Sequence, residues 1–147
     1  MRKGPFLFVL AAALTAGCGN SDAPTTSDLP AIPTAHDPNG ADIDEGVVLA
    51  ATEESGGIRL IKVLHVDDFP KPLDWEYHMM AFEPKAQTWE EAARLWKDKK
   101  VKIVLKRFTV RRTNFLTRDY RVLFKEPLTA EEREIYEASK RTYPSER

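Results

Sequence analysis

The chain of 147 residues contains a single cysteine, Cys18. One cysteine cannot form an internal disulfide, and zinc sites built from cysteine pairs are excluded as well. No other thiol is left for nucleophilic catalysis. The fold must therefore be held by a hydrophobic core. Its content of 42% apolar and 31% charged residues is an ordinary balance for a globular domain.

The common catalytic and nucleotide-binding motifs are also missing. No serine lies in a Gly-x-Ser-x-Gly nucleophile motif, and there is no His-Glu-x-x-His pair. The pair Gly56-Gly57 is typical of a hairpin turn, not of a phosphate-binding loop. The formal net charge of −1 argues against a general polyanion binder, and nucleic acid is not an expected partner. These absences favour a non-enzymatic protein.

The first 17 residues have the pattern of a secretory signal peptide. Arg2 and Lys3 are followed by an apolar stretch from Pro5 to Ala16 that only Thr15 interrupts. This stretch is shorter than the roughly 20 apolar residues that a membrane-spanning helix needs. A short positive segment followed by a short apolar run indicates export and removal of the segment.

The run Leu14-Thr15-Ala16-Gly17-Cys18 resembles the lipobox of bacterial lipoproteins, in which two small residues precede an obligatory cysteine. Thr15 stands where that family usually has leucine, and the resemblance covers residues 1–18 alone. It implies that residues 1–17 are removed and that Cys18 carries covalent lipid, palmitate included. Gly19 in place of Asp implies the outer membrane, in a cell that has one. Two or more acyl chains suffice for stable anchoring.

Residues 18–45 are predicted to form the lipidated cysteine and a disordered tether. After Cys18 the segment has four prolines, six acidic residues, no aromatic residue and no Lys or Arg. Such a composition buries too little apolar surface to fold. The tether would hold the following domain clear of the lipid headgroups.

Residues 46–147 are predicted to form a single α+β domain. Apolar β-rich runs predict strands over Val47–Thr52, Ile58–Val66, Trp75–Phe82, Val101–Arg112 and Arg121–Lys125. Capping boxes at Thr88-Trp89-Glu90-Glu91 and Thr129-Ala130-Glu131-Glu132 predict two helices. The order βββαββα indicates a largely antiparallel sheet of about five strands.

The two predicted helices differ in their apolar faces. The first repeats Trp89, Ala92, Ala93 and Trp96 at helical spacing and is expected to pack closely on the sheet. The C-terminal helix has few apolar residues and is expected to dock loosely. In the fourth strand the apolar positions change phase at Lys106-Arg107, which predicts a β-bulge.

One group of residues suggests a metal or catalytic site. If the second and third strands form a hairpin around the intervening loop, His65 lies opposite His78 and Asp67 lies opposite Glu76, all on one face. Two imidazoles and two carboxylates there could ligate a divalent metal such as zinc, or act as acid and base. A slip of one residue in the register would disperse the group. The alternative is two histidines near solvated carboxylates.

The charge distribution suggests a second kind of site. Residues 97–125 carry eleven Lys or Arg and two Asp, although the chain as a whole is nearly neutral. A candidate binding face consists of Arg107, Arg111, Arg112, Arg118 and Arg121. Guanidinium groups bind phosphate and carboxylate in bidentate fashion. The alternative is that these charges pair with nearby acidic residues or line a solvated face.

The sequence therefore supports two hypotheses. The first is a membrane-anchored cell-envelope lipoprotein that acts as a non-enzymatic binding or structural module, through its covalent lipid and a basic face. Its partner would be an anionic envelope glycan, a lipid headgroup or an acidic protein. The second is a metal- or small-ligand-binding protein, with or without catalysis, that uses His65, Asp67, Glu76 and His78. The first hypothesis needs no cofactor, and the second needs a divalent metal or another small ligand.

Overall fold

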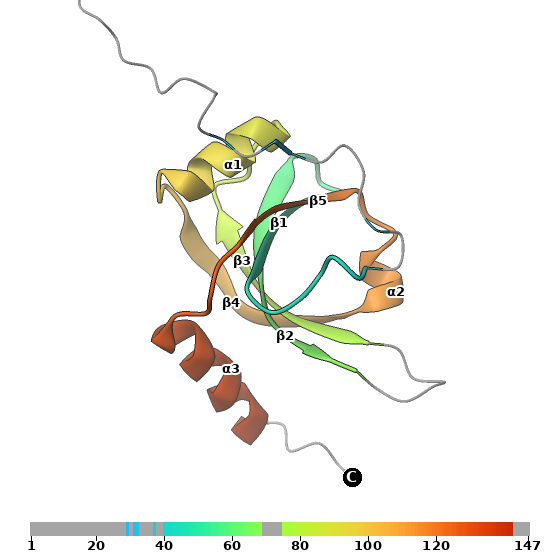
Figure 1. The fold of residues 1–147 in the computed structure, drawn as a ribbon, viewed down its shortest axis with the longest axis vertical. Coiled ribbons are helices and arrows are strands. Elements are labelled where there is room, and N and C mark those ends of the chain that lie inside the picture. Colours follow the sequence, from blue (N-terminus) through green and yellow to red (C-terminus); the bar gives the residue numbers. More distant parts are fainter. Residues whose placement is uncertain (1–28, 30, 33–36, 38–39, 69–74, 143–147) are drawn as a thin grey trace, which may run out of the picture.

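The computed structural model describes residues 29, 31–32, 37, 40–68 and 75–142. Five strands form one antiparallel sheet in the order β4-β3-β2-β1-β5 (Figure 1). The elements are β1 (Val47–Thr52), β2 (Ile58–Asp67), β3 (Glu76–Glu83), α1 (Trp89–Lys97), β4 (Lys102–Arg111), α2 (Arg112–Phe115), β5 (Tyr120–Lys125) and α3 (Ala130–Thr142). The predicted α+β fold is confirmed, with the single turn α2 added between the last two strands. The signal peptide and Cys18 lie outside the described residues.

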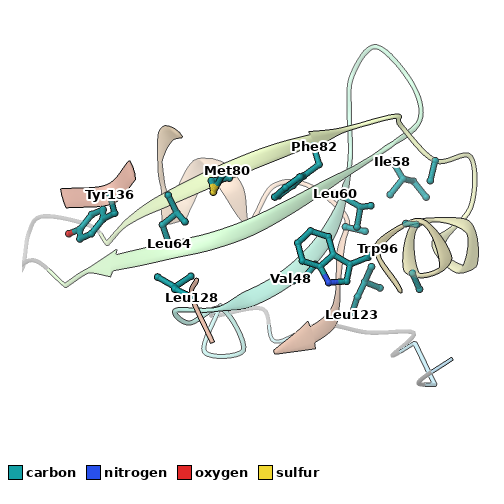
Figure 2. Close-up of a cluster of buried hydrophobic side chains, with 14 residues drawn as sticks. Val48, Ile58, Leu60, Leu64, Met80, Phe82, Trp96, Leu123, Leu128 and Tyr136 are labelled. Atoms are coloured by element: carbon teal, nitrogen blue, oxygen red, sulfur yellow. The ribbon is translucent and has the colours of Figure 1, made fainter. Parts of the chain in front are cut away.

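The strands β1, β2 and β3 are buried on both faces of the sheet. On the face that we call the helix face, an apolar cluster is covered by α1 at one end and by α3 at the other. Figure 2 shows Trp96 of α1 and Tyr136 of α3 at opposite ends of this cluster, with Leu60, Leu64 and Met80 between them. On the opposite face, which we call the loop face, strand residues pack against side chains that lie outside the sheet. The buried members of that cluster are Ile43, Val47, Leu49, Ala51, Ile61, Val63, Tyr77, Met79, Phe115 and Tyr120.

A bulge in β2 changes which of its residues face the helices. The pairs Val63 with Met79 and His65 with His78 leave Leu64 without a partner on β3. Side chains alternate between the two faces of a strand, so one extra residue reverses the alternation. The side chains of the consecutive residues Leu64 and His65 therefore both lie on the helix face.

A second bulge lies in β4 at the predicted position. Met79 pairs with Phe108 and Ala81 pairs with Leu105, so Lys106 and Arg107 together lie opposite the single residue between Met79 and Ala81. Phe108 packs in the cluster on the loop face. Lys106 and Arg107 both line the cleft on the helix face, which is described below.

The folded part begins earlier than the predicted boundary at residue 46. Ile43 is buried in the cluster on the loop face. The Tyr120 hydroxyl donates hydrogen bonds to the Asp42 carboxylate, at 2.6 Å, and to the Asp37 carbonyl, at 3.1 Å. The composition of residues 18–45 as a whole does not predict this packing. The side chains of Ile43 and Asp42 alone are enough to fix the end of the segment on the domain.

A buried lysine connects the sheet to both long helices. Lys62 of β2 is 2% exposed, and its ammonium lies 2.8 Å from the Glu132 carboxylate of α3. The same ammonium lies 5.9 Å from the centre of the Trp96 ring of α1. A buried charge needs a partner of opposite sign, so this ion pair holds the start of α3 against the sheet. Among the described residues, no helix is long and apolar enough to cross a membrane.

The Lys62–Glu132 pair gives a stability prediction. We expect Glu132→Gln to lower the free energy of unfolding by at least about 2 kcal/mol, because it leaves the buried ammonium without a counter-charge. Glu91→Gln is the matched control, because the Glu91 carboxylate accepts a backbone hydrogen bond at the start of α1, from Gln87, without contacting a buried lysine. Its effect should stay below about 0.5 kcal/mol. Urea denaturation measures both, and equal losses would contradict the assigned role of Lys62.

Candidate binding cleft under helix α3

The register of β2 and β3 brings the predicted histidine–carboxylate group together. His65 lies opposite His78 and Asp67 lies opposite Glu76, as the sequence predicted. The pairing depends on the bulge at Leu64. Without that bulge His65 would oppose Tyr77 and lie on the loop face.

The two histidines are linked through Asp67, which lies between them. Nε2 of His78 lies 2.6 Å from one carboxylate oxygen of Asp67, and Nε2 of His65 lies 3.3 Å from the other. Nδ1 of His65 lies 3.4 Å from the carboxylate of Glu45. The chain of contacts runs from solvent at Glu45 to the buried ring of His78.

The other nitrogen of His78 accepts hydrogen bonds from Arg107. Nη2 of Arg107 lies 2.9 Å from Nδ1 of His78, and Nε lies 3.3 Å from it. A guanidinium can only donate, so Nδ1 must carry a lone pair. The ring proton then sits on Nε2 and is donated to Asp67.

Tyr136 of α3 covers both imidazole rings. Its ring centre lies 4.7 Å from that of His65 and 5.3 Å from that of His78. Burial raises the pKa of the Tyr136 hydroxyl above its usual value, and the negative charge of Asp67 raises it further. The hydroxyl therefore remains protonated at neutral pH, and α3 is seated directly on the histidine network.

Three of the four predicted residues have the geometry of a metal site. One ligand atom each from Asp67, Glu76 and His78 lie within 4.8 Å of one another. However, the hydrogen bond from Arg107 keeps the His78 proton on Nε2, the nitrogen that faces the carboxylates. A metal at Nε2 requires a lone pair there, and therefore requires Arg107 to release Nδ1. The three side chains are close enough to ligate a metal, but Nε2 of His78 carries a proton where a metal needs a lone pair.

A cleft of about 970 Å³ opens beside His78, between β3 and β4 on one side and α3 on the other. Its lining combines apolar surface from Phe108 and Ile135 with polar groups from Arg107 and Thr109. Concave sites of this size with a few convergent polar groups are typical of ligand-binding pockets. The lining residues are Glu76, His78, Lys106, Arg107, Phe108, Thr109, Glu131, Glu134, Ile135, Ala138 and Ser139.

The two walls of the cleft differ in charge. On the sheet wall, β4 contributes Lys106 and Arg107 and β3 contributes Glu76, whereas the α3 wall has Glu131 and Glu134. Within the part of the chain that the structure describes, neither cation forms an ion pair with a carboxylate. The side-chain hydrogen bonds of Arg107 go to Nδ1 of His78.

The arginines of the predicted binding face do not share one exposed face. The structure distributes Arg107, Arg111, Arg112, Arg118 and Arg121 over β4, the turn that follows it, and β5, the opposite edge of the sheet. The guanidinium of Arg112 lies 4.7 Å from the Trp75 ring centre, and that of Arg121 lies 4.9 Å from the Trp89 ring centre. Only Arg111 and Arg118 are exposed. Of the five, Arg107 alone lines the cleft.

Sequence reasoning missed Tyr136 and Glu45 and gave Arg107 a different role. Tyr136 is one of the few apolar residues of the C-terminal helix, and their spacing does not show which residues of the sheet they cover. Glu45 was assigned to the tether by composition. The phase change at Lys106-Arg107 was a usable signal, because it places Arg107 on the helix face with His78.

Comparison of the chain with protein-family models, with curated proteins and with solved structures finds no match in any of the three.

The contact between Arg107 and His78 yields a prediction about zinc. We expect Arg107→Met to raise the affinity for Zn²⁺ by about tenfold or more, the size of effect that outer-shell partners have on metal sites. The change frees Nδ1 to take the ring proton, so that Nε2 can join Asp67 and Glu76 as a ligand. Isothermal titration calorimetry measures the affinity of the variant and of the wild type.

The matched control is Lys106→Met, which removes the neighbouring positive charge and leaves the contact to His78 in place. It should bind Zn²⁺ as the wild type does. Equal zinc affinities in all three proteins would contradict the role given to Arg107.

Proposed function

We propose that the protein is a lipid-anchored binding protein of the bacterial cell envelope, with its ligand site in the cleft under α3. The ligand carries a phosphate or carboxylate group that Arg107 and Lys106 hold. Anionic envelope glycans, lipid headgroups and acidic protein surfaces share this chemistry. Binding is the activity, and no reaction is catalysed.

The observation that carries this proposal is a guanidinium in the cleft that forms no ion pair with a carboxylate of the described residues. Arg107 is half-buried and fixed in place by two hydrogen bonds to His78. A guanidinium has five donors, so most of its hydrogen-bonding capacity remains for a ligand. Charge-assisted hydrogen bonds to an anion are the strongest that such a site can form. Phe108 and Ile135 supply adjoining apolar surface.

The state of His78 argues for binding over catalysis. A general base needs a lone pair directed at the substrate, and Nδ1 of His78 is directed at Arg107. The hydroxyl of Thr109 lies 3.4 Å from the same nitrogen and competes with the guanidinium for it. The His78–Asp67 pair therefore orients Arg107 instead of activating a nucleophile.

The membrane location rests on the lipobox-like segment that ends at Cys18. Lipid on this residue would place the cleft near the envelope surface, where anionic glycans and headgroups are concentrated. Two or more acyl chains anchor a protein stably. The outer membrane is the proposed site in a cell that has two membranes.

Lipidation is tested by replacing Cys18. We expect the full-length wild type to incorporate an alkynyl fatty acid in a bacterial host and to enter the detergent phase of Triton X-114. Cys18→Ser should lose both properties, because serine offers no thiol for the thioether bond. Ser21→Ala is the matched control and should behave as the wild type. A Cys18→Ser protein that stays labelled and detergent-soluble would contradict lipid anchoring.

The cleft is tested by titration with glycerol phosphate, followed by NMR. We expect shifts in the amide signals of residues 106–109 and 131–139. Arg107→Met should weaken binding about tenfold or more, because it removes charge-assisted hydrogen bonds worth roughly 1.5–3 kcal/mol. Arg118→Met is the matched control, since Arg118 is exposed and does not line the cleft. Shifts that are absent, or equally weakened by both variants, would overturn the cleft as the anion site.

Phosphatidylglycerol vesicles distinguish a headgroup from a soluble anion. Binding to glycerol phosphate and to the vesicles, lost from both in Arg107→Met, would assign a lipid headgroup. Binding to the soluble phosphate alone would assign a glycan or another soluble anion.

A divalent metal site is the second candidate, favoured by the mutual closeness of Asp67, Glu76 and His78. Zinc prefers imidazole and carboxylate ligands of this kind. In this function the wild type itself would release Nδ1 from Arg107 on binding the ion. Wild-type zinc affinity weaker than tens of micromolar in the calorimetric titration would exclude it.

A further inference from the structure

Strand β4 is an edge of the sheet with an exposed apolar segment. Among the strands of the described residues it pairs with β3 alone. Ile103, Val104 and Leu105 are 38, 43 and 51% exposed, and they are the exposed large hydrophobic residues of the described chain. The opposite edge strand, β5, has no such residue. Exposed apolar edge strands are templates for pairing with another chain.

An apolar pocket adjoins this segment. A cavity of about 420 Å³ on the loop face is lined by Val104 and Leu105 together with Ile61, Phe108 and Phe115. In strand addition, main-chain hydrogen bonds give affinity, and pockets that receive alternate side chains give specificity. The edge of β4 offers the main-chain hydrogen bonds, and the pocket can receive side chains of the added strand.

The charges around the segment indicate what kind of strand fits. Lys99, Lys100 and Lys102 lie at its start, each more than two-thirds exposed, and they form surface ion pairs with Glu126, Asp98 and Glu83 respectively. Exposed ion pairs contribute little to stability, so these lysines can still contact a carboxylate of a partner. Lys106 is exposed and follows at the end of the segment. Pairing with a second copy, in the antiparallel register that matches the three apolar residues to one another, puts Lys102 opposite Lys106. Like charges directly opposite are destabilising in a sheet. The occupant is therefore an acidic strand and not another copy of this chain.

We infer that β4 is a docking edge for an extended acidic peptide segment of a protein partner. The segment adds as a sixth strand beside Lys102–Lys106. Its apolar side chains enter the pocket at Val104 and Leu105, and its carboxylates meet the lysines. Lys106 also lines the cleft under α3, but the docking edge involves neither Arg107 nor His78, so either site can be present without the other.

Hydrogen–deuterium exchange of the wild type tests this inference with two synthetic probes, alternating Glu-Val and Lys-Val heptapeptides. At ten times the dissociation constant of the Glu-Val peptide, backbone amides of residues 102–106 that point away from β3 should exchange about tenfold more slowly. The Lys-Val peptide should give no protection. Val104→Glu should lose the protection, and the matched control Ala130→Glu, at an exposed position in α3, should keep it.

Three results would overturn the inference. One is the absence of protection at residues 102–106 with the Glu-Val peptide, which needs no variant to be folded. Another is equal protection by both peptides, which would show that the edge binds apolar strands regardless of their charge. The last is concentration-dependent self-association of the protein with the same amides protected, which would make a second copy the occupant.

Discussion

Two β-bulges determine which side chains meet on the helix face, and the candidate site depends on both. The bulge at Leu64 reverses the alternation of β2, so that His65 and Asp67 join Glu76 and His78. The bulge in β4 places Lys106 and Arg107 together opposite one residue of β3. The histidine network and its guanidinium therefore share one face, although they come from three strands.

The contacts that hold α3 on the sheet also form the site. Tyr136 covers both imidazoles, and the buried ammonium of Lys62 binds Glu132 one turn earlier in the helix. Because α3 makes one wall of the cleft, an anion bound there would contact a helix that the sheet already fixes by charge. Binding in the cleft should therefore be coupled to the docking of α3, since anything that binds the docked state alone also stabilises it.

Much of this arrangement was predictable, and the misses have physical reasons. The capping boxes at Thr88 and Thr129 gave both long helices, and the phase change at Lys106-Arg107 gave one bulge. The bulge at Leu64 was invisible, because Ile61, Val63 and Leu64 are all apolar and a strand buried on both faces shows no alternation. The five arginines do not form one binding face. A run of basic residues in the sequence does not show which aromatic ring or imidazole each guanidinium will contact.

The most direct test of the account is the proton on His78, measured by long-range ¹H–¹⁵N NMR correlation of the imidazole at neutral pH. We expect one ring proton, located on Nε2 and donated to Asp67, and a lone pair on Nδ1 that accepts from Arg107. A proton on Nδ1, or on both nitrogens, would contradict it. The first of these would leave Nε2 free for a metal or a substrate proton, and His78 would become the centre of the site in place of Arg107.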